Sequence, residues 1–257
     1  MEVLSPRSLE QALAIKAERP DAVPIQGGTD VMVELNFDRA RPPVLLNLNE
    51  VRELRGWSRD NGMLRLGSGL TYTEAMQLGE PLRALAEASR TVGGPQIRNR
   101  GTIGGNLGTA SPAGDALPPL LVYGAVVEVA STRGSREVPL QEFLVGPKRN
   151  ALEPDELIVA VRLAVPGPRQ TFMKVGPRNA MVISVVSLAM VVEDGEVRAS
   201  YGSAGPVPGL VTGAPDAEFA ERVAAAASPI DDVRGTERYR RHAVRVLTER
   251  ALKRVLA

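Results

Sequence analysis

The sequence predicts an α+β protein of two domains. Along the first 166 residues, short apolar runs of strand length alternate with segments of helical periodicity. After a Pro-Gly-Pro break at 166–168, three strand-like runs are followed by two helical segments. A run of strands followed by helices is typical of an α+β domain. The break is the expected boundary between domains at 1–166 and 167–257.

In the first domain, capping and turn residues delimit the expected elements. Ser8 and Gln11 form a capping-box pattern at the start of a first helix, and Pro20 ends that helix. Asp60-Asn61-Gly62 is typical of a hairpin turn. Two more helices are expected at 71–78 and 82–89. The expected strands are 22–26, 44–48, 63–67, 126–130, 137–140 and 157–163.

In the second domain, Asp194-Gly195 predicts a hairpin between two of three strands. Two helical segments follow, and the second of them is amphipathic. The expected strands are 171–175, 184–192 and 196–202, and the expected helices are 217–227 and 237–256.

The residue counts exclude several kinds of chemistry. The chain of 257 residues has one histidine and no cysteine, so thiolate zinc sites, iron–sulfur ligation and a Cys-His pair are impossible. His242 alone cannot build a histidine metal site. A net charge of +1 gives no general attraction to nucleic acid or membranes. With no signal-peptide pattern and no apolar run longer than is needed for a core strand, we expect a cytoplasmic protein without a membrane span or a metal.

The segment Gly27-Gly28-Thr29-Asp30 follows a predicted strand. Neither glycine has a Cβ, both can adopt positive φ, and successive backbone N–H groups in such a turn can bind a phosphate. A plain tight turn, in which Asp30 caps the next segment, explains the same residues. Taken alone, the tetrapeptide leaves both interpretations open.

A second glycine-rich segment, residues 101–112, lies in a stretch that we expect to be ordered. It matches neither the GxGxxG pattern of a Rossmann turn nor the GxxxxGK[ST] of a P-loop. It offers backbone donors and small polar side chains, and Asp115 follows as an acceptor for a sugar hydroxyl. Two such loops suit a long ligand with a pyrophosphate in its middle. Close packing of backbones is the alternative reason for the glycines.

Three motifs together resemble the FAD-binding subunit of the molybdenum hydroxylases, the family of xanthine dehydrogenase and carbon monoxide dehydrogenase. Further similarity at 154–158, 172–178 and 231–241 extends the resemblance over nearly the whole chain. Residues 96–100 and 146–150 are most similar to bacterial purine or xanthine dehydrogenases. The three motifs are Gly27-Gly28-Thr29-Asp30, Thr102-Ile103-Gly104-Gly105-Asn106-Leu107 and Ala110-Ser111-Pro112-Ala113-Gly114-Asp115.

The resemblance implies a vanillyl-alcohol-oxidase (PCMH)-type FAD-binding domain of two α/β subdomains, at about 1–54 and 55–166. A small domain of three antiparallel strands and helices would follow at 167–257. The resemblance also implies a molybdopterin-binding large subunit and a [2Fe–2S] small subunit as partners, in a dimer of heterotrimers. Electrons would pass from the clusters through FAD to NAD⁺ or another acceptor, such as oxygen or a quinone, in xanthine or purine oxidation. We expect the FAD to be non-covalent, because the chain has no cysteine and His242 lies outside the loops.

The resemblance further assigns roles to individual residues. The first loop would wrap the pyrophosphate, Asp115 would hold the ribose of the adenosine half, and Ile158 would pack near the flavin. Lys174 would reach the flavin ring; without the family it is interpreted as a solvated strand lysine. We expect Gly104→Val to remove FAD and leave the fold intact. The cofactor-binding set is Gly27, Gly28, Thr29, Asp30, Val31, Thr102, Gly104, Gly105, Asn106, Thr109, Asp115, Ile158 and Lys174, with no catalytic residue.

Two departures from the family pattern and two rival functions stay open. The chain begins late, so the first strand of the family is expected to be missing, and the segment 202–217 is shorter than usual. The helix at 237–256 has a basic exterior, interpreted as a solvated face, then as a partner contact, and least as a nucleic-acid site. The rivals are a free-standing flavin oxidoreductase of the same fold and a non-catalytic subunit that only holds partners together.

Overall fold

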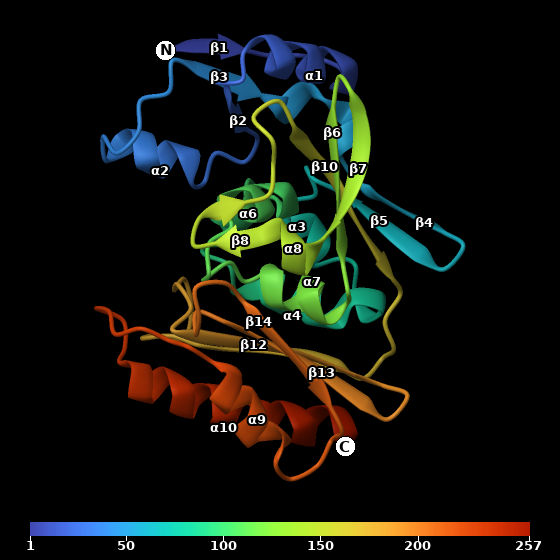
Figure 1. Ribbon diagram of the computed structural model, residues 1–257, viewed down its shortest axis with the longest axis vertical. Helices are drawn as coiled ribbons and strands as arrows, with labels where there is room; N and C mark the ends of the chain where they lie inside the picture. The colour runs from blue at the N-terminus through green and yellow to red at the C-terminus, as the bar shows by residue number, and fades with distance from the viewer.

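The computed structural model describes residues 1–257. Three larger β-sheets are stacked along the long axis of the chain (Figure 1), and a fourth sheet is a two-stranded hairpin. The expected α+β class is confirmed, because each of the larger sheets is covered by helices and has its own hydrophobic core. None of the helices combines the length and the apolar character needed to cross a bilayer.

The N-terminal sheet, at the top of Figure 1, has three parallel strands in the order β1-β3-β2. The predicted absence of a first strand is wrong, because Glu2 to Leu4 pair with Val44 to Leu46. The sheet consists of β1 (Glu2–Leu4), β2 (Val23–Ile25) and β3 (Val44–Asn47), with helices α1 (Leu9–Glu18) and α2 (Val31–Asn36) and the 3-10 turns η1 (Leu48–Glu50) and η2 (Arg52–Leu54).

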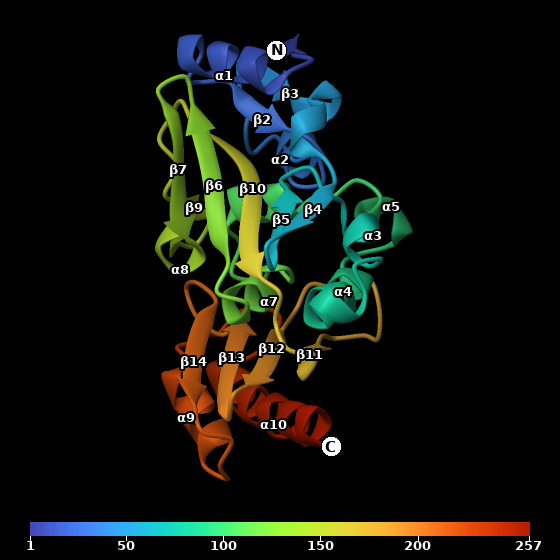
Figure 2. The same cartoon turned by 90° about the vertical axis from the view of Figure 1, so that its right-hand side faces the viewer.

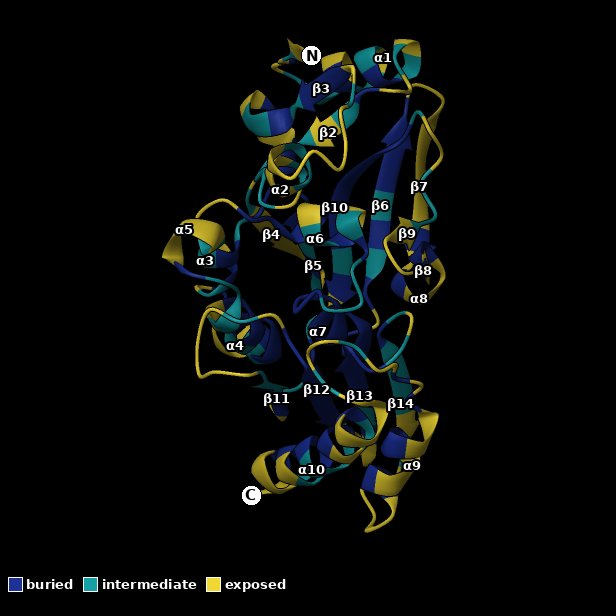
Figure 3. Ribbon diagram, turned by 90° about the vertical axis from the view of Figure 1, so that its left-hand side faces the viewer, coloured by how far each residue is buried: buried dark blue, intermediate teal, exposed yellow.

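Capping residues explain where α1 begins, whereas α2 is held differently. The Ser8 hydroxyl accepts a hydrogen bond from the Gln11 N–H, as the capping pattern predicts. The Gln11 side chain, however, accepts from the Arg7 N–H and not from Ser8. Helix α2 has no buried residue, and its exposed surface is visible in Figure 3. Packing therefore contributes little to α2, and contacts at the cavity described below fix its position.

The middle sheet is antiparallel, and its central strand is the last of its five strands in the sequence. The order is β4-β5-β10-β6-β7. Asn61 and Gly62 both have positive φ in the β4–β5 turn, as the Asn-Gly pair predicts. The strands are β4 (Trp57–Asp60), β5 (Met63–Gly67), β6 (Val126–Ser131), β7 (Gly134–Pro139) and β10 (Leu157–Ala164).

Helices between β5 and β6 pack against the middle sheet in one core (Figure 2). The predicted helix at 71–78 is shorter than expected, and Gly79, with φ of +60°, begins a separate turn. The stretch 93–119 is ordered, as predicted, and forms short helices. These elements are α3 (Tyr72–Ala75), η3 (Glu80–Leu82), α4 (Arg83–Thr91), α5 (Pro95–Arg98), α6 (Ile103–Thr109) and α7 (Leu117–Val122).

A small hairpin leads from β7 back to β10. It consists of α8 (Leu140–Phe143), β8 (Leu144–Gly146) and β9 (Arg149–Asn150). The hairpin contacts the end of α6 through two hydrogen bonds: the Lys148 N–H donates to the Ala110 carbonyl and the Asn150 amide donates to the Gly108 carbonyl. The hairpin thereby lies beside the second glycine-rich segment.

The C-terminal sheet has four antiparallel strands where the sequence predicted three. The additional strand is β14, which the sequence did not predict because it is short and has a glycine at each end. Gly209 is required there because a Cβ would lie 2.2 Å from the Tyr201 ring. The elements are β11 (Gln170–Val175), β12 (Val186–Glu193), β13 (Glu196–Gly202), β14 (Gly209–Gly213), α9 (Phe219–Ala226) and α10 (Glu237–Leu256).

Helix α10 is fixed to its sheet by a buried arginine. Arg240 is only 2 % exposed, and its guanidinium donates to the carbonyls of Val185 and Ser203 and to Asp232. Burial acts to raise the pKa of Asp232, but hydrogen bonds from Arg234 and Arg240 outweigh it and lower the pKa to about 2. The outer faces of α9 and α10 are exposed (Figure 3).

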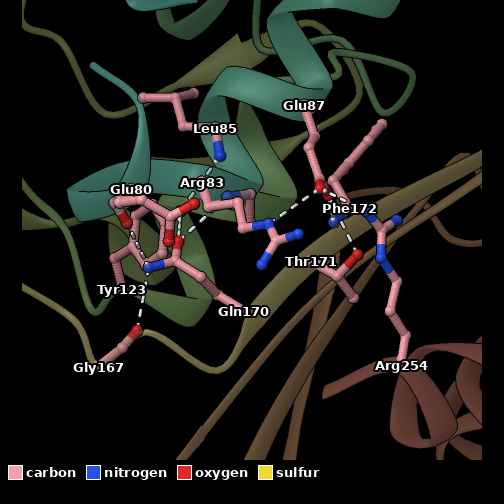
Figure 4. Close-up of polar contacts among 11 residues, drawn as sticks. Glu80, Arg83, Leu85, Glu87, Tyr123, Gly167, Gln170, Thr171, Phe172 and Arg254 are labelled. Atoms are coloured by element: carbon pink, nitrogen blue, oxygen red, sulfur yellow. Dashed lines mark hydrogen bonds and ion pairs between the residues drawn. The ribbon is translucent and has the colours of Figure 1, made fainter. Parts of the chain in front are cut away.

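The edge strand β11 joins the C-terminal sheet to α4 (Figure 4). The Gln170 carbonyl oxygen accepts from the Ala84 N–H and from the Tyr123 hydroxyl, at 3.0 and 2.5 Å. The Glu87 carboxylate accepts from the Thr171 hydroxyl and the Phe172 N–H, at 3.1 and 2.8 Å. Helix α4 thus satisfies the free edge of the sheet, which positions the rest of β11 relative to the middle sheet.

Candidate functional site

A cavity of about 680 Å³ lies between the N-terminal and middle sheets. Its wall combines the first glycine loop, α2, α6, the β8–β9 hairpin and the start of β10. It brings together most of the residues that the sequence predicted, which are Gly27, Gly28, Thr29, Asp30, Val31, Thr102, Gly104, Gly105, Asn106, Thr109 and Ile158.

The two glycine loops are in direct contact. A Cβ on Gly27 would lie 2.2 Å from the Arg100 carbonyl oxygen, so only glycine allows the loops to approach so closely. The Thr109 hydroxyl at the end of α6 donates to Asp30 at the start of α2, at 2.8 Å. The loops therefore form one continuous wall, although they are far apart in the sequence.

The first loop presents free hydrogen-bond donors to the cavity. The backbone N–H groups of residues 27–31 donate to no acceptor in the protein. Gly28 has a φ of +74°, which favours glycine and turns the chain there. Successive free N–H groups in a turn of this kind are the arrangement that binds a phosphate.

The second loop uses its backbone donors within the protein. The N–H groups of Ile103 and Gly104 donate to the carbonyls of Leu70 and Ser68, and that of Gly105 donates to the Thr102 hydroxyl. A Cβ on Gly104 would lie 2.5 Å from the Ser68 Cβ. The expectation that Gly104→Val would leave the fold intact is therefore wrong. At Gly105 only the Thr102 hydroxyl is closer than 4 Å, so this glycine keeps the cavity open.

Asn106 holds the chain that follows the second loop. Its side-chain oxygen accepts from the Ala116 N–H at 3.3 Å, and its amide packs on Gly114, where a Cβ would lie 2.6 Å away. Asn106 thereby positions the segment that carries Asp115.

Asp115 and Lys174 do not line this cavity. They form a buried ion pair instead, with 2.5 Å between Lys174 Nζ and Asp115 Oδ2, and side-chain exposures of 6 % and 7 % for Lys174 and Asp115. Lys174 also donates to the Thr91 carbonyl at 3.1 Å, whereas Asp115 Oδ1 has no partner. Burial raises the pKa of Asp115 to about 6, although the Lys174 ammonium acts to lower it.

Lys174 faces a second, cationic cavity of about 530 Å³ between α4, α5 and the segment after β11. The lining residues include Arg90, Arg98 and Arg178 and no carboxylate. No sequence pattern indicated this cluster, because its members come from two segments, 90–98 and 174–178, that are distant in the sequence. The interpretation of Lys174 as a solvated lysine does not fit its burial.

Sequence reasoning also missed polar residues of the first cavity. Tyr72 is buried there, and burial raises the pKa of its phenol well above the usual value, so the hydroxyl stays protonated. Ser68 lines the wall, and its buried hydroxyl has no partner in the protein. The other missed residues include Glu34, Lys148, Asn150 and Glu156. Their positions were the only sequence signals for these residues. Glu34 follows the first glycine motif, and Lys148, Asn150 and Glu156 lie within 146–158.

The cavity fits a long ligand with a central phosphate group. It offers five successive free N–H groups, an unpartnered buried hydroxyl and a glycine, Gly105, that keeps space open, and no three His, Asp or Glu side chains form a metal site. The fold and the cavity thus define a protein that binds one extended, phosphate-bearing cofactor. A family described as "FAD binding domain in molybdopterin dehydrogenase" matches residues 1–166. The chain belongs to this family, and its cofactor is FAD.

Individual relatives agree with this family. The xanthine dehydrogenase FAD-binding subunit of Escherichia coli O157:H7 is 30% identical over 275 residues, covering 97% of this chain and 94% of that protein. The nicotinate dehydrogenase FAD-subunit of Eubacterium barkeri is 35% identical over 202 residues, covering 75% and 68%.

Solved structures share the fold over nearly the whole chain. Reconstituted CO dehydrogenase from Oligotropha carboxidovorans has a chain with a TM-score of 0.92 at 24% identity, covering 99% of this chain and 97% of that one. Quinoline 2-oxidoreductase from Pseudomonas putida 86 has a TM-score of 0.89 at 24% identity, covering 99% and 96%. The short segment at 202–217 therefore does not change the C-terminal fold.

Proposed function

We propose that this chain is the electron-transfer subunit of a multi-subunit molybdenum hydroxylase. FAD would receive electrons from [2Fe–2S] clusters on a small subunit, while the substrate is oxidised on a molybdopterin-binding large subunit. The names of relatives that act on xanthine, nicotinate and caffeine support a nitrogen heterocycle, and we propose xanthine or another purine. The proposed assembly is a dimer of heterotrimers.

Within the chain, we propose that residues 1–166 hold FAD, with subdomains at about 1–54 and 55–166, and that residues 167–257 form a second domain. The free N–H groups of residues 27–31 would bind the pyrophosphate, and this is the observation that carries the proposal. The wall formed by Thr102, Gly105 and Ile158 would exclude water from the bound cofactor. FAD, when bound, supplies the electron-transfer chemistry.

The binding is proposed to be non-covalent. The chain has no cysteine, and His242 lies exposed on α10, on the C-terminal sheet. No side chain of either type therefore reaches the cavity to form a covalent link to the flavin.

The second cavity supports an anionic electron acceptor such as NAD⁺. Its four cations face a space with no carboxylate, and such a field attracts a pyrophosphate. Lys174 lines the second cavity, and its ammonium is paired with Asp115, at the end of the segment that follows α6. We keep Asp115 and Lys174 in the proposed cofactor-binding set on this ground.

The test is a Gly105→Val variant, which fills the open part of the first cavity. We expect it to weaken FAD binding by about 2–3 kcal/mol, because the side chain occupies the space of the cofactor. Titration followed by the visible flavin absorbance measures this. Gly167→Ala, where a Cβ makes only ordinary contacts, is the matched control.

Three results would contradict the proposal. Equal FAD affinity in Gly105→Val and the control would place the cofactor elsewhere. A chain that never acquires flavin absorbance would be a subunit that only holds partners together. A chain that oxidises a substrate without partner subunits would be a free-standing flavin oxidoreductase.

A further inference from the structure

The charges that line the FAD cavity have the wrong sign for a pyrophosphate. Three carboxylates face it, those of Asp30, Glu34 and Glu156, against a single cation, Lys148. Free N–H groups alone would have to offset both this field and the charge of the ligand. The cavity wall therefore needs a cation at the phosphate, and the chain supplies one candidate.

Two of the three carboxylates are already engaged by the protein. Glu156 accepts two hydrogen bonds from the Arg136 guanidinium, at 2.7 and 2.8 Å, and a third from the Glu153 N–H, at 2.8 Å. Asp30 accepts from the Thr109 hydroxyl. Glu34 has only one side-chain partner, Lys148, with 3.1 Å between Glu34 Oε1 and Lys148 Nζ. The Lys148 ammonium can thus pair either with Glu34 or with an anion bound in the cavity.

The backbone at Lys148, between β8 and β9, has an unusual conformation for a residue other than glycine. Lys148 has a φ of +54°, and its N–H donates to the carbonyl of Ala110, which has a φ of +46°. Two non-glycine residues with positive φ in direct contact store strain, which is characteristic of functional positions. The Lys148 side chain lines the cavity and is 66 % exposed, so it can exchange partners without opening a core.

Glu34 places Lys148 near the free N–H groups of the first loop. Glu34 is on α2, which begins at Val31, and three residues of helix advance the chain by only about 4.5 Å. A lysine side chain spans that distance. Arg100, the other cation beside the loop, donates to the Gln26 carbonyl and to Asn49 and does not line the cavity.

We propose that Lys148 is the cation that neutralises the FAD pyrophosphate, and that Glu34 competes with the phosphate for it. The proposal rests on the proposed function, because it requires FAD to occupy this cavity. It assigns opposite effects to two residues that pair with each other: Lys148 strengthens cofactor binding and Glu34 weakens it.

The experiment measures the binding of FAD, ADP and riboflavin to the full chain by calorimetry. We expect Lys148→Gln to weaken FAD and ADP by about tenfold and to leave riboflavin, which has no phosphate, unchanged. Lys148→Arg keeps the charge and the affinity. Glu34→Gln tightens FAD by roughly three- to fivefold, because the competitor is gone.

Arg149→Gln is the matched control, since Arg149 is the neighbouring exposed cation on the same hairpin and does not line the cavity. Its FAD affinity should equal that of the unmodified chain. Urea unfolding of the variants confirms that each is folded.

A purely mechanical role for the pair gives a different pattern. If Lys148→Gln and Glu34→Gln both weaken FAD, the pair only ties α2 to the hairpin and the proposal is wrong. Equal losses for FAD and riboflavin, or no loss at all in Lys148→Gln, also overturn it. Failure of the proposed function is separate: Gly105→Val would then bind FAD as the unmodified chain does.

Discussion

The two glycine-rich loops have similar compositions but differ in how their backbone N–H groups are used. In the first, the N–H groups of residues 27–31 have no acceptor in the protein, and they face the cavity. In the second, the N–H groups of residues 103–106 are all bonded within the protein, and Gly104 packs on Ser68. The first loop is available to bind a ligand, while the second shapes the wall against which the ligand lies.

The comparison shows that a glycine motif has no single meaning. Ligand approach and backbone packing were alternatives for each loop, and the structure uses both. Gly27 and Gly104 are packing positions, whereas Gly105 keeps space open. A substitution therefore reports on binding or on stability according to which atoms the missing Cβ would meet.

The largest effect should come from Gly104→Ala. The new Cβ meets Ser68 Cβ and the Ser68 carbonyl, at 2.5 and 2.7 Å, and neither can move without displacing the end of β5. We expect the free energy of unfolding to fall by about 3 kcal/mol, measured by urea denaturation. Gly105→Ala, one residue further on, should lose less than about 1 kcal/mol. Equal losses would remove the distinction between packing and open glycines.

The next largest effect should come from replacing Asp115, whose carboxylate follows the second glycine-rich segment. The pKa of Asp115 is raised to about 6 in the folded chain from a usual value of 3.8, so the folded state holds the proton more tightly. This contribution to stability is present at low pH and is lost as the pH rises from about 4 to about 6, by on the order of 2 kcal/mol.

Asp115→Asn isolates that contribution because the amide does not titrate. The difference in unfolding free energy between the two proteins, followed from pH 4 to pH 7, should change across this window and be flat above it. A constant difference would mean that the Lys174 ammonium keeps Asp115 ionised throughout.

The smallest effect should come from removing the hydrogen bond that links the two glycine loops. Thr109→Val removes the hydroxyl that donates to Asp30, and we expect a loss of about 1 kcal/mol in stability together with faster FAD release. Flavin fluorescence after dilution follows the release. Thr73→Val removes a hydroxyl that donates to Asn99, and neither residue lines the cavity, so it should leave the release rate unchanged.

Local signals predicted most of the fold. The Asn61-Gly62 turn and the ends of α10 at Glu237 and Leu256 agree with the sequence patterns, because caps and turn residues act over a few positions. Strand β14 was missed because its glycines carry little strand signal.

Long-range contacts account for what the sequence did not show at the site. The glycine motifs identified the two loops that meet in the cavity, but not the polar residues Ser68, Tyr72 and Lys148 that complete its wall. They did not show that Gly104 is bonded to Ser68, or that Asp115 is paired with Lys174, because the partners are distant in the sequence. Composition likewise says nothing about which backbone N–H groups remain free.

The position of β10 has a consequence for synthesis on the ribosome. The β4–β5 and β6–β7 hairpins can form as the chain emerges, but each presents an open edge until β10 inserts between β5 and β6. A nascent chain that stalls before Leu157 therefore exposes two unpaired edges and is prone to aggregate. Glu156 and Ile158 also complete the cavity wall. The cofactor can therefore be loaded only after β10, the last strand of the middle sheet, has left the ribosome.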